Sequence, residues 1–450
     1  MKNLAYTFRG GIHVEEYKNT RRSRIETLPP PAVVTIPLQQ HIGAPAAALV
    51  SKGDLVTVGQ KIADVAEGAL GCPIHASVSG KVTDIVKKVI PSGALVEHVV
   101  IENDMLDTPC PDNHPLTKKL TDATTEEIIE VVRSAGISGM GGAAFPTYAK
   151  IQSAIGKVDK IIVNCAECEP FITANHRLLL EHPASIINGV KILLKALGVH
   201  TAYIAIEDNK MDAVERIEDL LAGSKMISVK VMKTKYPQGD ERQLIYALTG
   251  AEIPAGKLPA DVGCVIFNAE TCAAIYKAFA YGTPSISRIV TVDGDCIRRP
   301  KNLLVPIGTS VADLIAFCGG LVREPKKLIN GGPMMGAAQW DMEMPVTKAT
   351  SAILVFSESM GRKRRSSGCI RCGKCIEHCP MHLMPMYIAQ FAKLDDLARA
   401  EDYGAMSCVE CGSCSYNCPG GVEIVQHIRV AKAAIRTEKA RLATLAKDKK

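Results

Sequence analysis

Several features that define other classes of protein are missing from this 450-residue sequence. No apolar run approaches the roughly 20 residues that a helix needs to cross a bilayer, so we expect no transmembrane span. The opening residues, MKNLAYTFRGGIHVEE, lack the apolar core of a signal peptide, and we expect the chain not to be exported. The net charge is only +6 and no basic, aromatic recognition module is present, which argues against a nucleic-acid partner.

Cysteine, by contrast, is abundant: there are 16, and half of them stand in two copies of one motif. The copies, GCIRCGKCIEHCP at 368–380 and SCVECGSCSYNCP at 407–419, each have the spacing C-x2-C-x2-C-x3-C-P. In two-cluster bacterial ferredoxins, three thiolates of each motif bind one 4Fe–4S cluster, and the cysteine before proline binds the other. The predicted ligand sets are Cys369, Cys372, Cys375 and Cys418 for one cluster, and Cys408, Cys411, Cys414 and Cys379 for the other.

Zinc and disulfides are the alternatives for these cysteines. Structural zinc usually takes its ligands as two separated pairs, whereas each motif here is a run of four before proline. Disulfides suit small secreted domains, and this chain is neither small nor led by a signal peptide. Two 4Fe–4S clusters are therefore the stronger prediction. The remaining eight cysteines are scattered, and we expect most of them to be small buried hydrophobic residues.

The pattern of strands and helices predicts a multidomain chain of α/β and α+β parts. An N-terminal extension, 1–30, is followed at 31–110 by short alternating strands between glycines, which predict a small antiparallel sandwich. Residues 111–285 alternate strands with helices, as in a largely parallel α/β sheet. Residues 286–350 are typical of a β-grasp module of the soluble-ligand-binding type. The two-cluster, ferredoxin-like helical domain fills 360–450 and ends in a basic helix.

The sandwich has a more specific likeness. VSKGDLVTVGQKIADV followed by PIHASVSGKVTDI resembles the barrel-sandwich hybrid of biotinyl and lipoyl carrier domains. In those carriers a lysine on the hairpin between the two segments bears the prosthetic group. Here the connection is AEGALGC, with no lysine between Lys61 and Lys81. We therefore expect a structural or docking module and not a swinging arm.

Iron–sulfur clusters carry one electron at a time, whereas a donor such as NADH delivers two as hydride. A flavin is the usual converter between the two, so we expect a flavin site beside the clusters. The segment GISGMGGAAFPTYAK, 136–150, is the candidate, because its glycines let backbone approach a phosphate or ring. A helix and not a strand precedes it, so it is not a Rossmann fingerprint. A plain connecting loop remains the alternative.

Three further segments place polar residues at strand exits: VNCAECEP at 163–170, YPQGDERQL at 236–244 and FNAETCAAI at 267–275. Ligands of parallel α/β sheets sit outside the carboxyl ends of the strands. The first segment offers Asn164, Glu167 and Glu169. Each acid taken singly could be a helix cap or a solvated carboxylate, but their joint placement favours one shared site.

These segments resemble, in order, four motifs of the flavin- and NADH-binding subunit of respiratory complex I: GMGGAAFPTYAK, VNCAECEP, YPQGDERQL and FNAET. The likeness extends over nearly the whole chain to another family. FRGGIHVEEYK, IPLQQHIGAPA and NGGPMMG, with the same domain order and the twin cluster motif, are similar to the RnfC subunit of the Rnf ion-translocating electron transport complex. The departures are Ala166 and Met140, which replace an aspartate and an arginine of the complex I motifs.

The resemblance implies bound FMN and NAD(H) beside the two 4Fe–4S clusters. For FMN it implies Gly139, Gly141, Gly142, Asn164, Tyr236, Gly239, Asp240, Asn268 and Thr271, with Glu167 as a further cofactor-binding residue. Toward the dinucleotide it implies Phe145, Lys150, Glu169 and Glu241. No catalytic side chain is expected, because hydride transfer between two bound rings needs stacking and exclusion of water. Cys165 and Cys168 are expected to line this site, with a metal or redox pair as the lesser alternative.

The resemblance also implies a function: an oxidoreductase subunit that couples electron transfer between ferredoxin and NAD to sodium or proton translocation. It implies a peripheral place on the cytoplasmic side of the cell membrane, held by other subunits, one of them an iron–sulfur subunit that exchanges electrons with ferredoxin. Cobalamin reductases of bacterial microcompartments, which share the flavin domain and twin motifs, are one alternative. An electron-relay scaffold with a vestigial flavin site is the other. The basic run GRKRRSSG, 361–368, is either a solvated linker or a docking strip.

Overall fold

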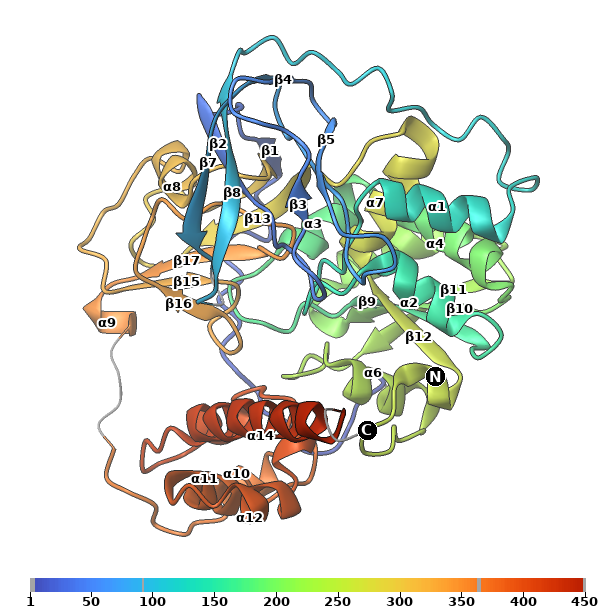
Figure 1. Cartoon of the computed structure of the whole chain (residues 1–450). Helices are drawn as coiled ribbons and strands as arrows, with labels where there is room; N and C mark the ends of the chain where they lie inside the picture. Colours follow the sequence, from blue (N-terminus) through green and yellow to red (C-terminus); the bar gives the residue numbers. More distant parts are fainter. Residues whose placement is uncertain (1–4, 91–92, 362–365, 448–450) are drawn as a thin grey trace.

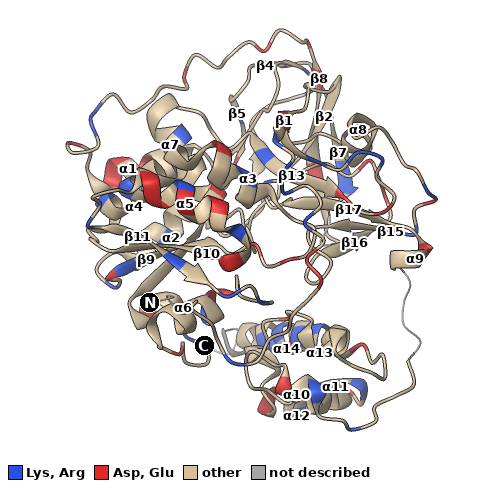
Figure 2. Ribbon diagram, turned by 180° about the vertical axis from the view of Figure 1, so that it is seen from behind, with Lys and Arg blue, Asp and Glu red and all other residues tan. Residues whose placement is uncertain are grey.

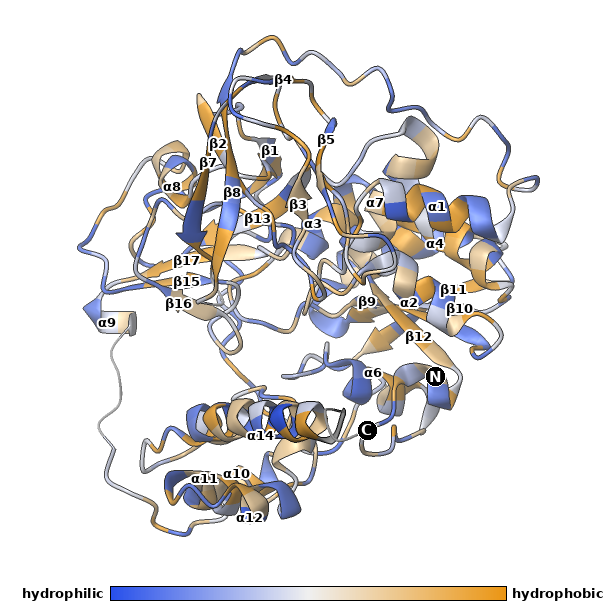
Figure 3. Cartoon of the chain, viewed as in Figure 1, coloured by the Kyte–Doolittle hydropathy of each residue, from blue (hydrophilic) through white to orange (hydrophobic). Residues whose placement is uncertain are grey.

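The structure, a computed structural model, describes residues 5–90, 93–361 and 366–447. Two β domains and an α/β domain form one body, and the C-terminal helices lie beneath it, at the lower left in the view of Figure 1. Apolar residues are concentrated on the strands and on the inner faces of the helices (Figure 3). Among the described residues, no helix combines the length and the apolar character needed to cross a bilayer.

The N-terminal sandwich is built from two antiparallel sheets. One has the order β2-β8-β7-β4 and the other β3-β5-β6. Alternate residues such as Val34, Ile36 and Ile62 are fully buried between them, which explains the period-2 pattern of the sequence. The strands are β2 (Val33–Pro37), β3 (Ala47–Ala48), β4 (Leu55–Val56), β5 (Lys61–Asp64), β6 (Ile74–His75), β7 (Gly80–Val89) and β8 (Leu95–Asn103).

The α/β domain has a four-stranded, fully parallel sheet in the order β11-β10-β9-β12. Its strands are apolar along most of their length because helices cover the sheet. The first helix begins with the predicted cap, since Thr124 and Glu127 form a capping box. The elements are α1 (Thr125–Ser134), α2 (Thr147–Ala154), β9 (Lys160–Cys165), α3 (Ala174–Glu181), α4 (Pro183–Leu197), β10 (Ala202–Glu207), α5 (Met211–Leu220), β11 (Ile227–Met232), α6 (Glu241–Thr249), β12 (Cys264–Asn268) and α7 (Ala269–Tyr281).

The third domain is a mixed six-stranded sheet in the order β1-β14-β13-β17-β15-β16. Two of its strands come from outside 286–350. Strand β1 belongs to the N-terminal extension and pairs in parallel with β14, and β17 lies between β13 and β15. The elements are β1 (Ile25–Thr27), β13 (Ser287–Asp293), β14 (Lys301–Pro306), α8 (Val311–Phe317), β15 (Lys327–Asn330), β16 (Ala337–Gln339), β17 (Ala352–Phe356) and α9 (Glu358–Gly361).

The C-terminal domain is helical, and its small core includes two of the motif cysteines, Cys375 and Cys414, beside Ile388 and Ile428. The last helix is the predicted basic one, and Lys and Arg recur along it (Figure 2). The central part of the basic run before this domain, 362–365, lies outside the described residues. The helices are α10 (Lys374–Glu377), α11 (Pro385–Lys393), α12 (Leu397–Asp402), α13 (Ser413–Tyr416) and α14 (Ile424–Lys447).

The N-terminal extension runs across three of these domains. Tyr6 forms a bridge with Met232, the last residue of β11. Gly11 N–H donates to the carbonyl of His378 in the C-terminal domain at 3.1 Å. The extension then enters the six-stranded sheet as β1. The segment therefore holds the C-terminal helices against the α/β domain.

Candidate functional site

Two asparagines lie next to each other at the carboxyl edge of the parallel sheet. The register pairs Asn164, near the end of β9, directly with Asn268, the last residue of β12. The Asn268 side chain caps α7 by accepting from Glu270 N–H at 2.8 Å. The Asn164 amide donates to the Gly239 carbonyl at 2.7 Å. Three segments that are far apart in the sequence therefore meet at one edge, as the strand-exit rule predicted.

The glycine loop before α2 is fixed above this edge. Met140 N–H donates to Thr271 Oγ1 at 3.0 Å. A Cβ on Gly141 would lie 2.7 Å from Asn268 Nδ2, so the loop needs glycine there to approach the strand end. Gly142 is exposed, and a Cβ on it would meet no atom within 4 Å. The loop presents bare backbone to open space, which is the surface that a flavin phosphate or ring requires.

The residues predicted to face the dinucleotide come from this loop and from α2 and α6. Phe145 closes the loop by accepting from Gly139 N–H at 2.9 Å, and its side chain is 37 % exposed. Lys150 Nζ lies 3.8 Å from a carboxylate oxygen of Glu241. Burial lowers the pKa of Lys150. Phe145 is thus partly open to solvent, whereas the two charged residues pair with each other.

Two of the predicted acidic residues serve as helix caps. The Glu167 carboxylate accepts from the N–H groups of Asn175 and His176 in the first turn of α3, at 2.7 and 3.1 Å. Asp240 accepts from Arg242 N–H and Gln243 N–H in the first turn of α6. Burial raises the pKa of Asp240 to about 6. The structure therefore shows the helix-cap alternative for both side chains, and a contact of either with a cofactor stays a prediction.

Glu169 links the α/β domain to the six-stranded sheet domain. Its carboxylate accepts from Met334 N–H at 3.0 Å and from Met335 N–H at 2.9 Å. Gly332 precedes these residues, and a Cβ there would lie 2.3 Å from the Glu169 carboxyl carbon. Burial raises the pKa of Glu169 to about 7. The NGGPMMG segment is thus shaped around this carboxylate.

Two cations that were not predicted as site residues hold these segments, the buried Arg288 and the half-buried Lys18. Arg288, which is 1 % exposed, pairs with Glu270 at 3.0 Å and donates to the Met140 carbonyl at 3.0 Å. Lys18 Nζ donates to three carbonyls of the loop after β9, those of Glu167, Glu169 and Ile172. An isolated charged residue is part of no sequence pattern, so the sequence did not indicate the role of Arg288. The only signal for Lys18 was its place in the segment FRGGIHVEEYK.

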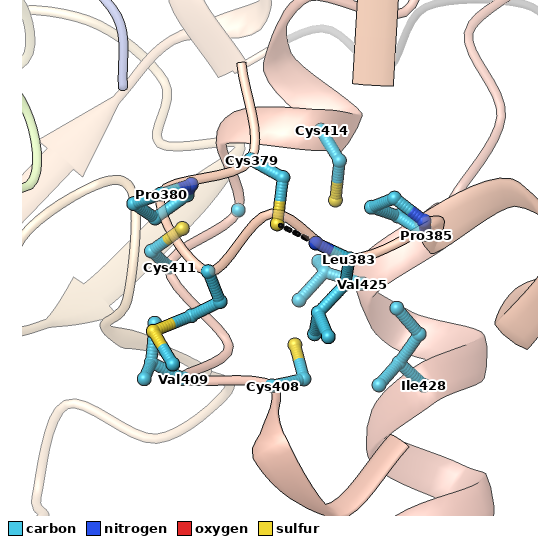
Figure 4. A pocket seen from close by; sticks show the side chains of 12 residues that line it. Cys379, Pro380, Leu383, Pro385, Cys408, Val409, Cys411, Cys414, Val425 and Ile428 are labelled. Atoms are coloured by element: carbon cyan, nitrogen blue, oxygen red, sulfur yellow. Dashed lines mark hydrogen bonds between the residues drawn. The ribbon is translucent and has the colours of Figure 1, made fainter. Parts of the chain in front are cut away.

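The C-terminal domain brings four cysteines of the predicted sets around one pocket, here called the inner pocket (Cys379, Cys408, Cys411 and Cys414). Figure 4 shows sulfurs of the second motif directed toward the same space as Cys379 of the first. Leu383 N–H donates to Cys379 Sγ and Glu410 N–H donates to Cys408 Sγ, at 3.4 and 3.3 Å. Such bonds stabilise thiolate sulfur.

The other four cysteines line the outer pocket (Cys369, Cys372, Cys375 and Cys418). Val422 N–H donates to Cys418 Sγ at 3.4 Å, which repeats the Leu383 bond of the inner pocket. Cys369 and Cys372 are exposed, whereas the inner cysteines are buried or half-buried. Within the described residues no three His, Cys, Asp or Glu side chains are close enough together to hold a single metal ion. Each set surrounds a space instead.

Tyr236, predicted beside FMN, contacts the inner pocket. Its hydroxyl donates to the Cys411 carbonyl at 2.6 Å, and its side chain is 1 % exposed. Its ring packs in a small apolar cluster with Ile12 and Cys411, against which Cys168 and Met334 pack. Cys168 Sγ accepts from Gly239 N–H at 3.4 Å, and burial raises the pKa of the Cys168 thiol. The inner pocket therefore adjoins the segments of the flavin-like edge.

The residues fit the groups that the sequence suggests. Bare glycine backbone and paired asparagines lie at a sheet edge suited to FMN, and each pocket is lined by four thiols with backbone donors to sulfur. Together they define a flavin and iron–sulfur protein. Models of four families match in chain order: the RnfC barrel sandwich hybrid domain at 6–106, the Nuo51 FMN-binding domain at 132–277, the SLBB domain at 289–338 and a 4Fe-4S dicluster domain at 362–419. The predicted fold class and the FMN and 4Fe–4S cofactors are confirmed.

Curated relatives cover nearly the whole chain. It is 44 % identical, over 95 % of its length and 93 % of the relative, to the subunit designated C of the proton-translocating ferredoxin:NAD(+) oxidoreductase complex of Clostridium ljungdahlii. It is 42 % identical, over 95 % and 97 %, to the subunit designated C of the Na(+)-translocating ferredoxin:NAD(+) oxidoreductase complex of Acetobacterium woodii. The chain belongs to the RnfC family of Rnf complex subunits, as its sequence motifs predicted.

Proposed function

We propose that this chain is the subunit of a ferredoxin:NAD oxidoreductase complex at which NAD(H) and single-electron carriers meet. The observation that carries the proposal is the contact between the two sites. Tyr236, from the segment after β11, donates to the main chain of Cys411 in the inner pocket. Bound FMN would supply the conversion between hydride and single electrons, and the clusters would store single electrons.

The residues of the chain would bind and orient these groups. Gly139, Gly141 and Gly142 would lie along the flavin, with Asn164 and Asn268 beneath the loop. Phe145 would stack on the dinucleotide through its exposed face. Glu167, Glu169 and Asp240 would position backbone, because their oxygens accept from main-chain N–H groups.

The two cluster pockets would differ in role. The inner pocket is covered and adjoins the flavin-like edge, whereas the outer pocket exposes Cys369 and Cys372. Electrons would therefore pass between the α/β domain and the inner pocket, and the outer pocket would exchange them with another protein. The relatives' names support partner subunits in an ion-translocating complex. We place the chain on the cytoplasmic side of the membrane, with an iron–sulfur subunit that exchanges electrons with ferredoxin among its partners.

The test is made on the full chain produced without oxygen. Iron, flavin and the visible spectrum are measured before and after NADH is added. About eight irons per chain, together with FMN that NADH bleaches, would support the proposal. Eight irons with no flavin, or flavin that NADH leaves oxidised, would contradict it and favour the relay alternative. NADPH added in parallel would show whether the site selects between the two dinucleotides.

A further inference from the structure

The barrel-sandwich domain reaches the glycine loop of the α/β domain. Ile42 N–H donates to the Ala144 carbonyl at 3.2 Å. Ala144 directly precedes Phe145, which is 37 % exposed. Ile42 lies in the segment IPLQQHIGAPA, which no expected cofactor contact included. Its side chain is 46 % exposed although its backbone is anchored here. An apolar side chain is thus held in solvent beside the predicted dinucleotide site.

A second loop of the same domain supports Ile42. It is the hairpin connection AEGALGC, the place where carrier domains bear their lysine. The Leu70 carbonyl accepts from Ala44 N–H at 2.8 Å, and a Cβ on Gly43 would come 2.1 Å from the Leu70 oxygen. Cys72 N–H donates to His41 Nε2 at 3.1 Å. The two loops are therefore tied together on both sides of Ile42, and the Leu70 side chain is 37 % exposed.

The pair of loops is docked on the α/β domain by a buried ammonium group. Lys348 Nζ, which is fully buried, donates to the Pro73 carbonyl at 2.8 Å and to the Gly136 carbonyl at 2.6 Å. Pro73 follows the hairpin connection, and Gly136 follows α1 and begins the glycine segment. The hairpin and the glycine segment thus share one cation, so their relative position is fixed.

We infer that Ile42 and Leu70 form an apolar wall that, with Phe145, receives a flat ring of the bound dinucleotide. This inference rests on the proposed function, since it names residues of the same NAD(H) site. Covering an exposed apolar side chain with a ring removes apolar surface from water, which lowers the free energy of the complex. A wall whose backbone is already fixed loses little conformational entropy when the ring covers it. The hairpin that carries a cofactor in carrier domains here helps to bind a diffusing one.

The experiment measures equilibrium binding and not turnover. NAD+ is titrated by calorimetry into the anaerobic, flavin-loaded full chain and into three variants. Ile42→Asp places a charge in the wall, Ile42→Leu restores an apolar side chain, and Leu55→Asp is the matched control. Leu55 lies on β4 of the same domain and is 78 % exposed. Flavin content of each variant shows whether the neighbouring site is intact.

We expect Ile42→Asp to raise the Kd for NAD+ at least tenfold, with Ile42→Leu and Leu55→Asp within twofold of the unaltered chain. Equal Kd values for Ile42→Asp and the unaltered chain would overturn the inference that Ile42 forms part of the dinucleotide site. If Ile42→Asp lost its flavin, Leu70→Asp would replace it, and an unchanged Kd there would overturn the inference equally. An unaltered chain that binds no NAD+ would instead contradict the proposed function itself, which separates the two failures.

Discussion

The Tyr236 hydroxyl donates a 2.6 Å hydrogen bond to the main-chain carbonyl of Cys411, and this bond joins two domains through residues that lie 175 positions apart in the sequence. Both partners are buried, so neither can replace the bond with water. The contact fixes how the inner pocket is placed against the carboxyl edge of the parallel sheet.

Tyr236→Phe removes this bond and leaves the Cys411 carbonyl unsatisfied. A buried polar group without a partner costs about 1–3 kcal/mol, so we expect a lower melting temperature for the variant. We also expect NADH to bleach its flavin at the normal rate, while cluster reduction becomes slower. Stopped-flow spectra that separate the two phases test this. Tyr281→Phe, at a 61 % exposed tyrosine, is the control. Equal rates of cluster reduction in the unaltered chain and in both variants would refute a role of the Tyr236 bond in electron transfer to the clusters.

Gly142→Ala tests the glycine loop without disturbing the fold. Its Cβ would meet no protein atom within 4 Å, and its φ is not left-handed, so the flavin-free chain should be at least as stable as before. A bound flavin would meet the new methyl group. Overpacking of a close contact costs about 1–3 kcal/mol, so FMN should bind about tenfold more weakly. Unchanged FMN binding by fluorescence titration would place the flavin elsewhere.

The crossing of ligands between the motifs can be tested with pairs of Cys→Ser substitutions. Cys379 lies in the first motif but faces the inner pocket with Cys408. Replacing Cys379 and Cys408 together should therefore remove one cluster and leave about four irons per chain. Replacing Cys379 and Cys369 together should damage both clusters. If the two double variants had these iron contents reversed, each motif would bind its own cluster.

The half-buried Glu169 gives a pH dependence with a definite sign. Its pKa is raised from 4.5 to about 7, so between these values the folded chain holds a proton that the unfolded chain has lost. Stability therefore falls as pH rises from 4.5 to 7, by at most about 3 kcal/mol. Melting temperatures at pH 5 and pH 8 should differ less in Glu169→Gln than in the unaltered chain. The exposed Glu252→Gln should leave the difference unchanged.

Structural elements could be predicted from the sequence where a local pattern exists. The capping box of Thr124 and Glu127 and the parallel strands depend on such short-range regularities, and both are present. The motif cysteines line two pockets in the predicted grouping, and their role as cluster ligands stays a prediction. Contacts between domains have no such regularity. Nothing near Tyr236 in the sequence indicates Cys411 as its partner, and a lone Arg288 or Lys348 looks like any surface cation.

The acidic residues of the candidate site also show a limit of prediction from the sequence. Glu167 and Asp240 follow strands, as binding residues often do, but helix N-termini also follow strands in α/β folds. The spacing alone could not separate a cap from a cofactor contact. The distinction depends on which backbone N–H groups point at the carboxylate, and that is decided by the turn between strand and helix.

The path of the N-terminal extension has a consequence for the order in which the chain is assembled during synthesis. The segment leaves the ribosome before the residues that it pairs with, since β1 needs Asn302 as its pairing partner and Gly11 needs the carbonyl of His378. Its docking must therefore wait until most of the protein has been translated. Residues of this segment are therefore made early and docked late, and their docking ties the C-terminal helices to the rest of the chain.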